Sequence, residues 1–391
     1  MVLKIDFQKH NEEVVMVMDA YVKRKPLRVP VILSFNSRIW ILNPELNREG
    51  ITFQKFLSDP EIMFQTMLKF MYYSAHNIVH DVEMGIPSKQ WIIGPYHANV
   101  FDSAYFGAEV ETRDGQVPAT LPILAGDRKN LIFDKGIPDS FGGFMGKIRN
   151  DYEYFLTRVK NFEFHGKPVQ VVPPSPLGFD GPLTVATDLR GTELFTDIYE
   201  DPEYVEKLLC FITDAVIKRV KDWRKYINPF AGEEKLQSGW LADDSIQLIS
   251  EEMYKSLVLP FHKKWFNEMY GEGPHLMHLC GNVQRHLPFI SKELKVKSFD
   301  TGFPIDFSKL RKDIGPDVEI FGGVKVDTLL RDTPENVEKT TKEILQSGIM
   351  DGGRFILKEA NNLAPCTPLE NIQALYNAAK KYGKYRGDLN L

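Results

Sequence analysis

The second half of the chain repeats a strand-then-helix pattern, and this repeat constrains the fold more than any other feature. Short apolar runs at 169–172, 235–244, 274–280, 296–300, 318–322 and 353–357 alternate with segments of helical periodicity. Alternation at this spacing is typical of a parallel sheet whose strands are joined by helices. The sequence contains neither a Gly-x-Gly-x-x-Gly loop after a first strand nor a Walker phosphate loop, so neither nucleotide-binding fold is supported. We therefore predict an α/β fold, a (β/α)8 TIM barrel forming one domain over residues 1–391.

The first half of the chain follows this pattern less regularly. Residues 8–24 have amphipathic helical periodicity and predict an N-terminal helical extension, and strands are predicted at 28–35 and 91–97 with a helix at 60–80 between them. From about 110 to 165, Gly, Pro, Asp and aromatic residues are mixed without a clear period. A long irregular stretch in a compact enzyme is typical of a lid or binding segment. We predict that this insertion covers the active site.

Charge and cysteine content exclude several classes of protein. Lys plus Arg is 48 against 53 for Asp plus Glu, a net charge of -5 without a long basic run, so nucleic acid is not an expected partner. The sequence lacks a membrane-spanning apolar stretch of about 18 residues and the regions of a signal peptide. The three cysteines are too few for a disulfide framework, and Cys210 lies in an apolar helical stripe. We predict a cytoplasmic protein; the sequence leaves the oligomeric state open, a homodimer included.

A candidate metal site lies in the segment 274–281, an apolar run that ends in Gly281-Asn282 and predicts a buried strand leading into a loop. Side chains alternate along a strand, so His278 and Cys280 point to the same side, about 6 to 7 Å apart along it. An imidazole and a thiol placed in this way can bind one metal ion, and zinc accepts mixed nitrogen and sulfur ligands. The same pair is also compatible with an ordinary core, because cysteine is among the most buried residues.

Other chemically capable residues fall at the ends of predicted strands. Cys366 lies in a polar, Pro-rich loop just before the last predicted helix, which is an unusual place for an inert thiol. Asp243 and Asp244 end another strand, where they could orient a ligand or take a proton, or simply face solvent or cap a turn. Because barrel active sites lie at the C-terminal ends of the strands, we expect these acids and Cys366 to converge with His278 and Cys280.

Aromatic and basic residues near the same strand ends are candidates for substrate binding. They could stack on an aromatic ring or line the site, although aromatic residues at helix–sheet junctions are also typical of the core. The candidates are Arg38, Trp40, Tyr96, His97, Tyr105 and Trp240.

Several segments resemble the uroporphyrinogen decarboxylase superfamily. The resemblance covers roughly residues 28–383, and it implies a (β/α)8 barrel. It rests on Gly181–Ala186, Asp197–Val205, Gly322–Asp327, Thr333–Val337 and Thr367–Ile372.

Within that superfamily, His278-x-Cys280-Gly281 together with Cys366 is similar to the zinc-binding branch of corrinoid methyltransferases, which includes coenzyme M methyltransferases and components of O-demethylase systems. Carried over by position, His278, Cys280 and Cys366 would be the zinc ligands. Three protein ligands leave a fourth position open, as in catalytic zinc sites. No corrinoid-binding Asp-x-His-x-x-Gly is present, so the resemblance implies that the cobalt is carried by a separate corrinoid protein.

The decarboxylase activity itself has less support. The family's Arg-Gln-Ala-Gly-Arg motif corresponds to Ser34–Arg38, which keeps one arginine only. Asp102 is a candidate match for the family's catalytic aspartate. We therefore expect a zinc-dependent methyltransferase acting between cobalt and a small methyl donor or acceptor, with methoxyaromatic donors favoured. The alternatives are transfer from a methylcorrinoid to a thiol, and a metal-free decarboxylase.

Overall fold

The strands that follow residue 235 form one parallel sheet in the computed structural model, which describes residues 5–230 and 235–385. Its strands are β6 (Trp240–Ala242), β7 (His275–Leu279), β8 (Val296–Thr301), β9 (Glu319–Val324) and β10 (Phe355–Glu359). They lie side by side in the order β10-β9-β8-β7-β6, so each strand is a neighbour of the next strand in sequence. Helices connect them, as parallel pairing requires. The predicted strands of this half are confirmed.

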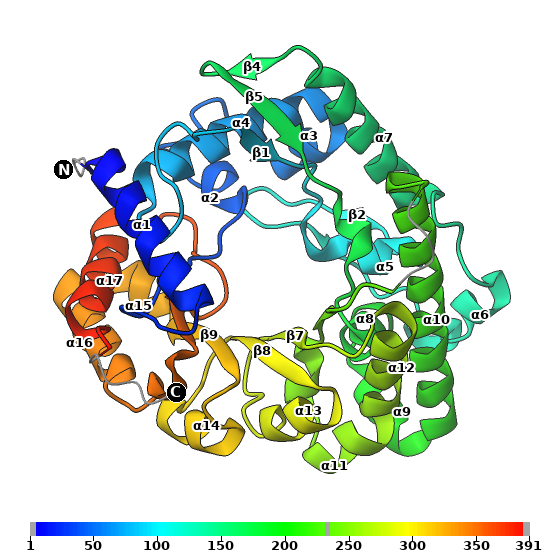
Figure 1. Cartoon of the computed structure of the whole chain (residues 1–391). Helices are drawn as coiled ribbons and strands as arrows, with labels where there is room; N and C mark the ends of the chain where they lie inside the picture. The colour runs from blue at the N-terminus through cyan, green and yellow to red at the C-terminus, as the bar shows by residue number, and fades with distance from the viewer. Residues whose placement is uncertain (1–4, 231–234, 386–391) are drawn as a thin grey trace.

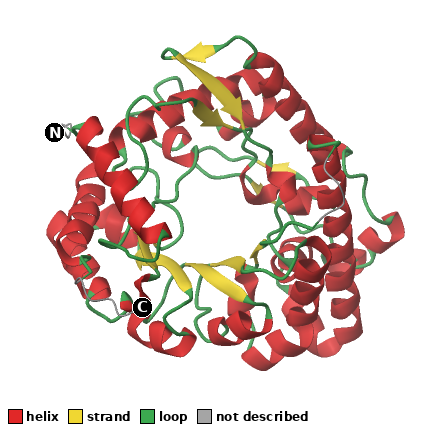
Figure 2. Cartoon of the chain, in the orientation of Figure 1, coloured by secondary structure: helices red, strands yellow, loops and turns green. Residues whose placement is uncertain are grey.

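The sheet continues past β10 into the first half of the chain. Val31 bridges Leu357 in parallel, and the backbone N–H of Ile32 donates to the carbonyl of Leu357 at 3.0 Å. On the other side of the molecule, β1 (Trp91–Ile93) pairs in parallel with β5 (Lys167–Val171), which also forms a hairpin with β4 (Glu163–Phe164). Together with the surrounding helices these strands form a ring (Figures 1 and 2). The fold is an α/β fold of the TIM-barrel type.

The helices lie mainly on the outside of this ring (Figure 2). In the first half they are α1 (Phe7–Val22), α2 (Arg38–Ile41), α3 (Phe53–Ser58), α4 (Pro60–Asn77), α5 (Phe101–Tyr105), α6 (Leu131–Lys135), α7 (Gly143–Arg158), α8 (Pro182–Arg190) and α9 (Glu193–Glu200). In the second half they are α10 (Pro202–Ile227), α11 (Glu251–Met253), α12 (Leu259–Met269), α13 (Leu287–Glu293), α14 (Phe307–Ile314), α15 (Val326–Arg331), α16 (Pro334–Leu345) and α17 (Leu369–Tyr382).

Local sequence explains where several of these helices begin. Asp59, Asp201 and Thr333 each accept a hydrogen bond from a backbone N–H of the first turn, and each is followed by a proline at the first helical position. An oxygen-bearing cap satisfies an otherwise unpaired N–H, and proline needs no hydrogen-bonding partner there. The helix predicted at 60–80 is confirmed and ends at Asn77.

The core of the five-stranded sheet is built in register. Leu241, Met277, Phe299, Ile320 and Phe355 are partners across consecutive strands, and all five are fully buried. The next register row carries Ala242, His278 and Asp300 on β6 to β8 and continues with Phe321 and Ile356 on β9 and β10. Because successive side chains of a strand point to opposite faces of the sheet, His278 and Asp300 lie on the other face from the fully buried apolar row.

The segment 110–165 is more regular than predicted. It contains the two-stranded hairpin of β2 (Val110–Glu111) and β3 (Ala119–Thr120), and the 16-residue helix α7. Met145, Ile148 and Phe155 of α7 are fully buried, and the helix packs against α4 and α5 on the outside of the ring (Figure 1). The part of the segment that forms α7 therefore belongs to the barrel wall, whereas the sequence predicted an irregular lid.

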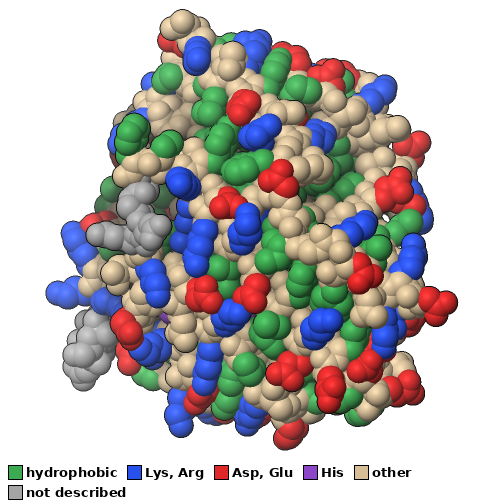
Figure 3. All heavy atoms as spheres, turned by 90° about the vertical axis from the view of Figure 1, so that its right-hand side faces the viewer, with side chains coloured by type: hydrophobic (Ala, Val, Ile, Leu, Met, Phe, Trp, Pro, Cys, Tyr) green, Lys and Arg blue, Asp and Glu red, His purple; other side chains and the backbone are tan. Residues whose placement is uncertain are grey.

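The outer surface carries charges of both signs. On the face shown in Figure 3, basic and acidic side chains are interspersed and neither sign dominates. This agrees with the small net charge of -5. Among the described helices, none is both long and apolar enough to cross a membrane.

Candidate metal centre

Three potential metal ligands converge at the C-terminal ends of β6 and β7. His278 lies near the end of β7, Cys280 follows that strand, and Asp244 lies in the loop after β6. One ligand atom from each lies within 4.8 Å of the other two, and all three residues are partly buried. The predicted convergence of His278, Cys280 and Asp244 is therefore present in the structure. Among the described residues, these three form the one group of three or more His, Cys, Asp or Glu side chains that is close enough together to hold a metal ion.

A chain of hydrogen bonds orients the imidazole of His278. Its Nδ1 lies 2.8 Å from a carboxylate oxygen of Asp300, its register partner on β8, and its Nε2 lies 3.0 Å from Sγ of Cys280. Asp300 in turn accepts a hydrogen bond from Nζ of Lys358 on β10, at 2.8 Å, and the same ammonium donates to Oγ of Ser34 at 2.8 Å. A carboxylate on the far nitrogen of a metal-binding histidine fixes the ring and strengthens it as a ligand. Nε2 is thereby directed toward the cluster.

The electrostatics of the cluster favour a cation. Burial alone would lower the pKa of His278, but its hydrogen bonds to Asp300 and Cys280 and their negative charges outweigh burial and raise that pKa to about 11. The pKa of Asp300 is lowered, because hydrogen bonds from His278 and the charge of Lys358 overcome the effect of burial. The proton on His278 therefore compensates negative charge inside the barrel. A divalent cation can replace that proton.

The donor atoms present fit zinc. They are an imidazole nitrogen, a thiol sulfur and a carboxylate oxygen, and zinc binds all three at about 2.0 to 2.3 Å. Oδ1 of Asp244 accepts the backbone N–H of Cys280 at 2.6 Å, which leaves the second oxygen of this carboxylate available. Burial raises the pKa of Asp244, and the charge of His278 opposes that effect.

Cys366 lies outside this cluster. It is exposed in the loop between β10 and α17, and its backbone has a positive φ of 63°. The structure therefore does not bring Cys366 together with His278 and Cys280, and its assignment as a zinc ligand stays a prediction. The third donor of the cluster in the structure is Asp244, whereas the resemblance implied Cys366.

Asp243 has a structural role although it adjoins Asp244. Its carboxylate is fully buried and accepts hydrogen bonds from the backbone N–H groups of Leu183 and Thr184, at 3.2 and 2.8 Å. The hydroxyl of Thr184 and the ring of His262 also contact it, at 2.8 and 2.9 Å. Both oxygens are thus occupied in holding the start of α8. The prediction of a direct role in ligand orientation or proton transfer does not fit this geometry.

Asp102 also makes structural contacts with both of its carboxylate oxygens. It forms a buried ion pair with Arg219, whose side chain is fully buried, and its second oxygen accepts the backbone N–H of Asp180 at 2.8 Å. Both carboxylate oxygens of Asp102 are thus engaged within the fold, and its role as the catalytic aspartate stays a prediction. Its place in the structure is that of a support for Asp180, whose own pKa is raised by burial and by the charges of Asp102 and Asp244.

The predicted substrate-binding residues divide into two groups. Tyr105 is buried and its hydroxyl donates to a backbone carbonyl of Pro138 at 3.0 Å, and His97 is fully buried with Nε2 2.7 Å from Asp151. These two support the packing of α5 and α7. The others retain accessible surface and remain candidates: Arg38, Trp40, Tyr96 and Trp240.

Sequence reasoning missed Asp300 and Lys358. Asp300 closes the predicted strand 296–300, and Lys358 follows the apolar run Phe355–Leu357, yet its side chain is almost completely buried. A charged residue continuing a strand buried on both faces was the available signal, because such residues are rarely buried without a partner.

The neighbouring Glu359 gives a testable dependence of stability on pH. It is fully buried, accepts the backbone N–H of Ser34, and burial raises its pKa to about 8 from 4.5, against the opposing charge of Lys358. Between about pH 5 and 8 the folded protein holds a proton that the unfolded chain has released, so stability falls as pH rises. In Glu359→Gln this fall is expected to be absent, and the variant should exceed the wild type in stability above pH 8 by about 1 to 3 kcal/mol.

Urea unfolding at one-unit steps from pH 5 to 9 measures this effect, with the exposed Glu343→Gln as the matched control. A stability difference between Glu359→Gln and wild type that is the same at every pH would contradict it.

Comparison with known proteins identifies the family. The model of the uroporphyrinogen decarboxylase (URO-D) family matches residues 177–382. This is more than half of the chain and includes the cluster of Asp244, His278 and Cys280. The chain belongs to the uroporphyrinogen decarboxylase family. The resemblance found from the sequence motifs is confirmed.

The relatives found by sequence are methyltransferases. A methylated-thiol–coenzyme M methyltransferase of Methanosarcina mazei is 34% identical over 206 residues, which is 51% of each chain. A methylcobamide:CoM methyltransferase MtbA of Methanosarcina acetivorans is 25% identical over 210 residues, 52% of this chain and 56% of the relative. The chain thus matches about half the length of these curated relatives.

At the level of structure the likeness extends over most of the chain. A solved methyltransferase from Methanosarcina mazei superimposes with a TM-score of 0.62, covering 94% of this chain and 98% of the other at 18% identity. This likeness shows that the two proteins share a fold.

Proposed function

We propose that this protein is a zinc-dependent methyltransferase that moves a methyl group between a small substrate and the cobalt of a separate corrinoid protein. The observation that carries the proposal is the cluster of His278, Cys280 and Asp244 at the C-terminal ends of the strands, where barrel enzymes have their active sites. The two relatives, a methylated-thiol–coenzyme M methyltransferase and a methylcobamide:CoM methyltransferase, support the same reaction class.

The protein's own residues have defined tasks in this proposal. His278, Cys280 and Asp244 hold the metal, with Cys366 as the further predicted ligand. Asp300 keeps Nδ1 of His278 protonated and Nε2 directed at the metal, and Lys358 holds Asp300 in place. Bound zinc would supply Lewis acidity, which favours the thiolate form of a thiol or polarises an ether oxygen.

The residues around the site and the names of the relatives favour a thiol as the substrate over the methoxyaromatic compound favoured from the sequence. The aromatic lining expected for a methoxyaromatic is reduced, because Tyr105 is buried and hydrogen-bonded within the fold. One relative is a methylated-thiol–coenzyme M methyltransferase and the other is a methylcobamide:CoM methyltransferase, so both names contain a thiol. We therefore propose a small thiol or methylated thiol as the substrate, with a methoxyaromatic as the second candidate.

A methyl-transfer assay tests the proposal. Zinc-loaded protein is incubated with methylcobalamin and a small thiol, and in parallel with reduced cobalamin and either a methyl thioether or a methoxyaromatic. We expect loss of the methylcobalamin absorbance only when thiol and protein are both present, and a rate at least about 100-fold lower in Cys280→Ser, because the metal-held substrate is lost. Release of carbon dioxide from a uroporphyrinogen with no methyl transfer would overturn the proposal in favour of a decarboxylase.

A further inference from the structure

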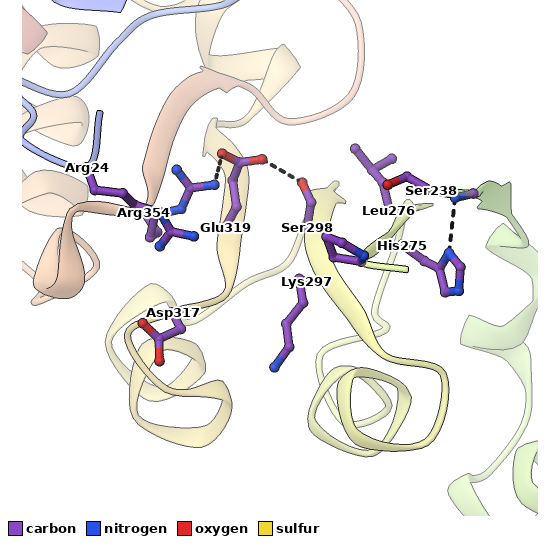
Figure 4. A pocket seen from close by; sticks show the side chains of 11 residues that line it. Arg24, Ser238, His275, Leu276, Lys297, Ser298, Asp317, Glu319 and Arg354 are labelled. Atoms are coloured by element: carbon purple, nitrogen blue, oxygen red, sulfur yellow. Dashed lines mark hydrogen bonds and ion pairs between the residues drawn. The ribbon is translucent and has the colours of Figure 1, made fainter. Parts of the chain in front are cut away.

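A polar cavity lies at the end of the barrel strands opposite to the candidate metal centre. It has a volume of about 440 Å³ and is lined mostly by residues at the beginnings of β6 to β10 (Figure 4). His275 begins β7 at this cavity, three residues before His278, so the cavity is separated from the candidate metal centre by about 10 Å of strand. The residues that matter for its chemistry are Arg24, His275, Lys297, Asp317, Glu319 and Arg354.

The cavity contains more hydrogen-bond donors than acceptors. Arg24 and Lys297 both line it, and neither has an ion-pair partner among residues 5–230 and 235–385. The carboxylate of Glu319 is already used: it accepts from Tyr21 at 2.8 Å, from Arg354 at 2.6 Å and from Ser298 at 2.9 Å. Figure 4 shows the last two of these contacts. Glu319 is therefore not available to neutralise Arg24 or Lys297.

Two further donors lie on the walls of the cavity. Nε of Arg354 is buried and has no hydrogen-bond partner in the described structure, although its Nη2 is paired with Glu319. Nδ1 of His275 accepts the backbone N–H of Gly239 at 3.0 Å, so the proton of the neutral ring is on Nε2. The adjacent charges, Glu272 and Lys295, pair with each other. A buried donor without a partner is unfavourable unless a ligand or water supplies an acceptor.

Asp317 is the lining carboxylate that no described side chain neutralises. The cavity also contains two cations without an ion-pair partner, the ammonium of Lys297 and the guanidinium of Arg24. Together with the one carboxylate of Asp317, these unpaired groups have a net positive charge. Forked guanidinium groups and an ammonium together match the oxygens of a phosphate or a carboxylate.

We propose that this cavity is a binding site for a small oxyanion, a phosphate or carboxylate compound, held between Arg24 and Lys297. The site does not depend on the metal cluster or on methyl transfer, since its residues lie at the opposite ends of the strands. A failure of the methyltransferase proposal would therefore leave this one standing, and the reverse also holds.

Calorimetric titration with inorganic phosphate, and separately with succinate, tests the site at low ionic strength with chloride-matched controls. We expect saturable binding of at least one probe, weakened at least about tenfold in the Arg24→Gln/Lys297→Gln double variant, because two charge-assisted contacts are lost. Asp317→Asn should bind several-fold more tightly, since it removes the opposing charge. Phosphate binding alone would assign a phosphate compound, and succinate binding alone a carboxylate.

Two control variants distinguish binding in this cavity from binding of the anion elsewhere on the protein. The exposed Lys292→Gln removes a surface charge on α13 and should bind the probe as the wild type does. Cys280→Ser should also bind normally, which excludes an anion held at the metal centre. Absence of binding to the wild type, or equal binding by the double variant, would overturn the proposal.

Discussion

Cys280→Ser is expected to abolish stoichiometric zinc binding while leaving the barrel folded. The sulfur of Cys280 lies 3.0 Å from Nε2 of His278, at the centre of the cluster, whereas its side chain contributes little to the buried apolar core. Replacing a thiolate by a hydroxyl removes the ligand that binds zinc most strongly while conserving shape. We expect zinc affinity to fall by more than about 100-fold, since one of few protein ligands is lost.

Metal analysis after dialysis, with circular dichroism as the check on folding, measures the effect. Cys210→Ser is the matched control, because Cys210 lies on α10 with Sγ 3.7 Å from Asp214, away from the cluster. Zinc retained at one ion per chain in Cys280→Ser would refute the assignment of the site.

The same measurement decides the third ligand. Asp244→Asn and Cys366→Ser are compared under identical conditions. Loss of zinc in the first alone assigns Asp244, which the structure brings into the cluster. Loss in the second alone assigns Cys366, as predicted from the resemblance, and requires its exposed loop to move toward His278.

Asp300→Asn is expected to lower zinc affinity by about 10- to 100-fold without removing any ligand. The carboxylate of Asp300 accepts the hydrogen bond from Nδ1 of His278 and is itself held by Lys358. An amide in its place has the same shape but no charge, so the imidazole is held less firmly and is a weaker base toward the metal. Stability should also fall, because the almost fully buried ammonium of Lys358 loses its carboxylate partner.

Competition with a chromogenic chelator measures the affinity, and the exposed Asp313→Asn on α14 serves as the control. Lys358→Met provides a second variant, which should also weaken zinc binding by freeing Asp300. It is expected to destabilise the fold by about 3 to 5 kcal/mol as well, because it leaves the carboxylate of Asp300 without the ammonium that it pairs with. Equal zinc affinity in the wild type and Asp300→Asn would show that Asp300 does not support the metal.

The sequence predicted what depends on short-range pattern. The strand at 275–279 and the position of His278 and Cys280 on one side of it follow from alternation along a single strand. The support from Asp300 and Lys358 could not be obtained in this way. It depends on the register between β7 and β8 and on a contact between β8 and β10, which are separated by 58 residues at the Asp300–Lys358 pair.

Adjacent residues with the same chemistry show the limit most clearly. Asp243 and Asp244 are equivalent in the sequence, but Asp243 has backbone angles of φ -165° and ψ 74° at the end of β6. The chain turns there, so one carboxylate points toward α8 and the other toward Cys280. No pattern in the sequence distinguishes them, because their directions depend on how α8 packs against the 3-10 turn Asp244–Leu248 that follows β6.

Lys358 and Glu359 have a further consequence, because both also contact Ser34. The ring is closed where backbone hydrogen bonds join the segment 28–33 to β10, a contact that we call the seam. Next to it, the hydroxyl of Ser34 accepts a hydrogen bond from the ammonium of Lys358, and the backbone N–H of Ser34 donates to Glu359. The same ammonium fixes Asp300, and through it His278. The seam and the metal-binding imidazole therefore share one set of contacts. By thermodynamic reciprocity, an ion that orders the imidazole also makes the ring harder to open, and a loosened seam weakens the hold on the ion.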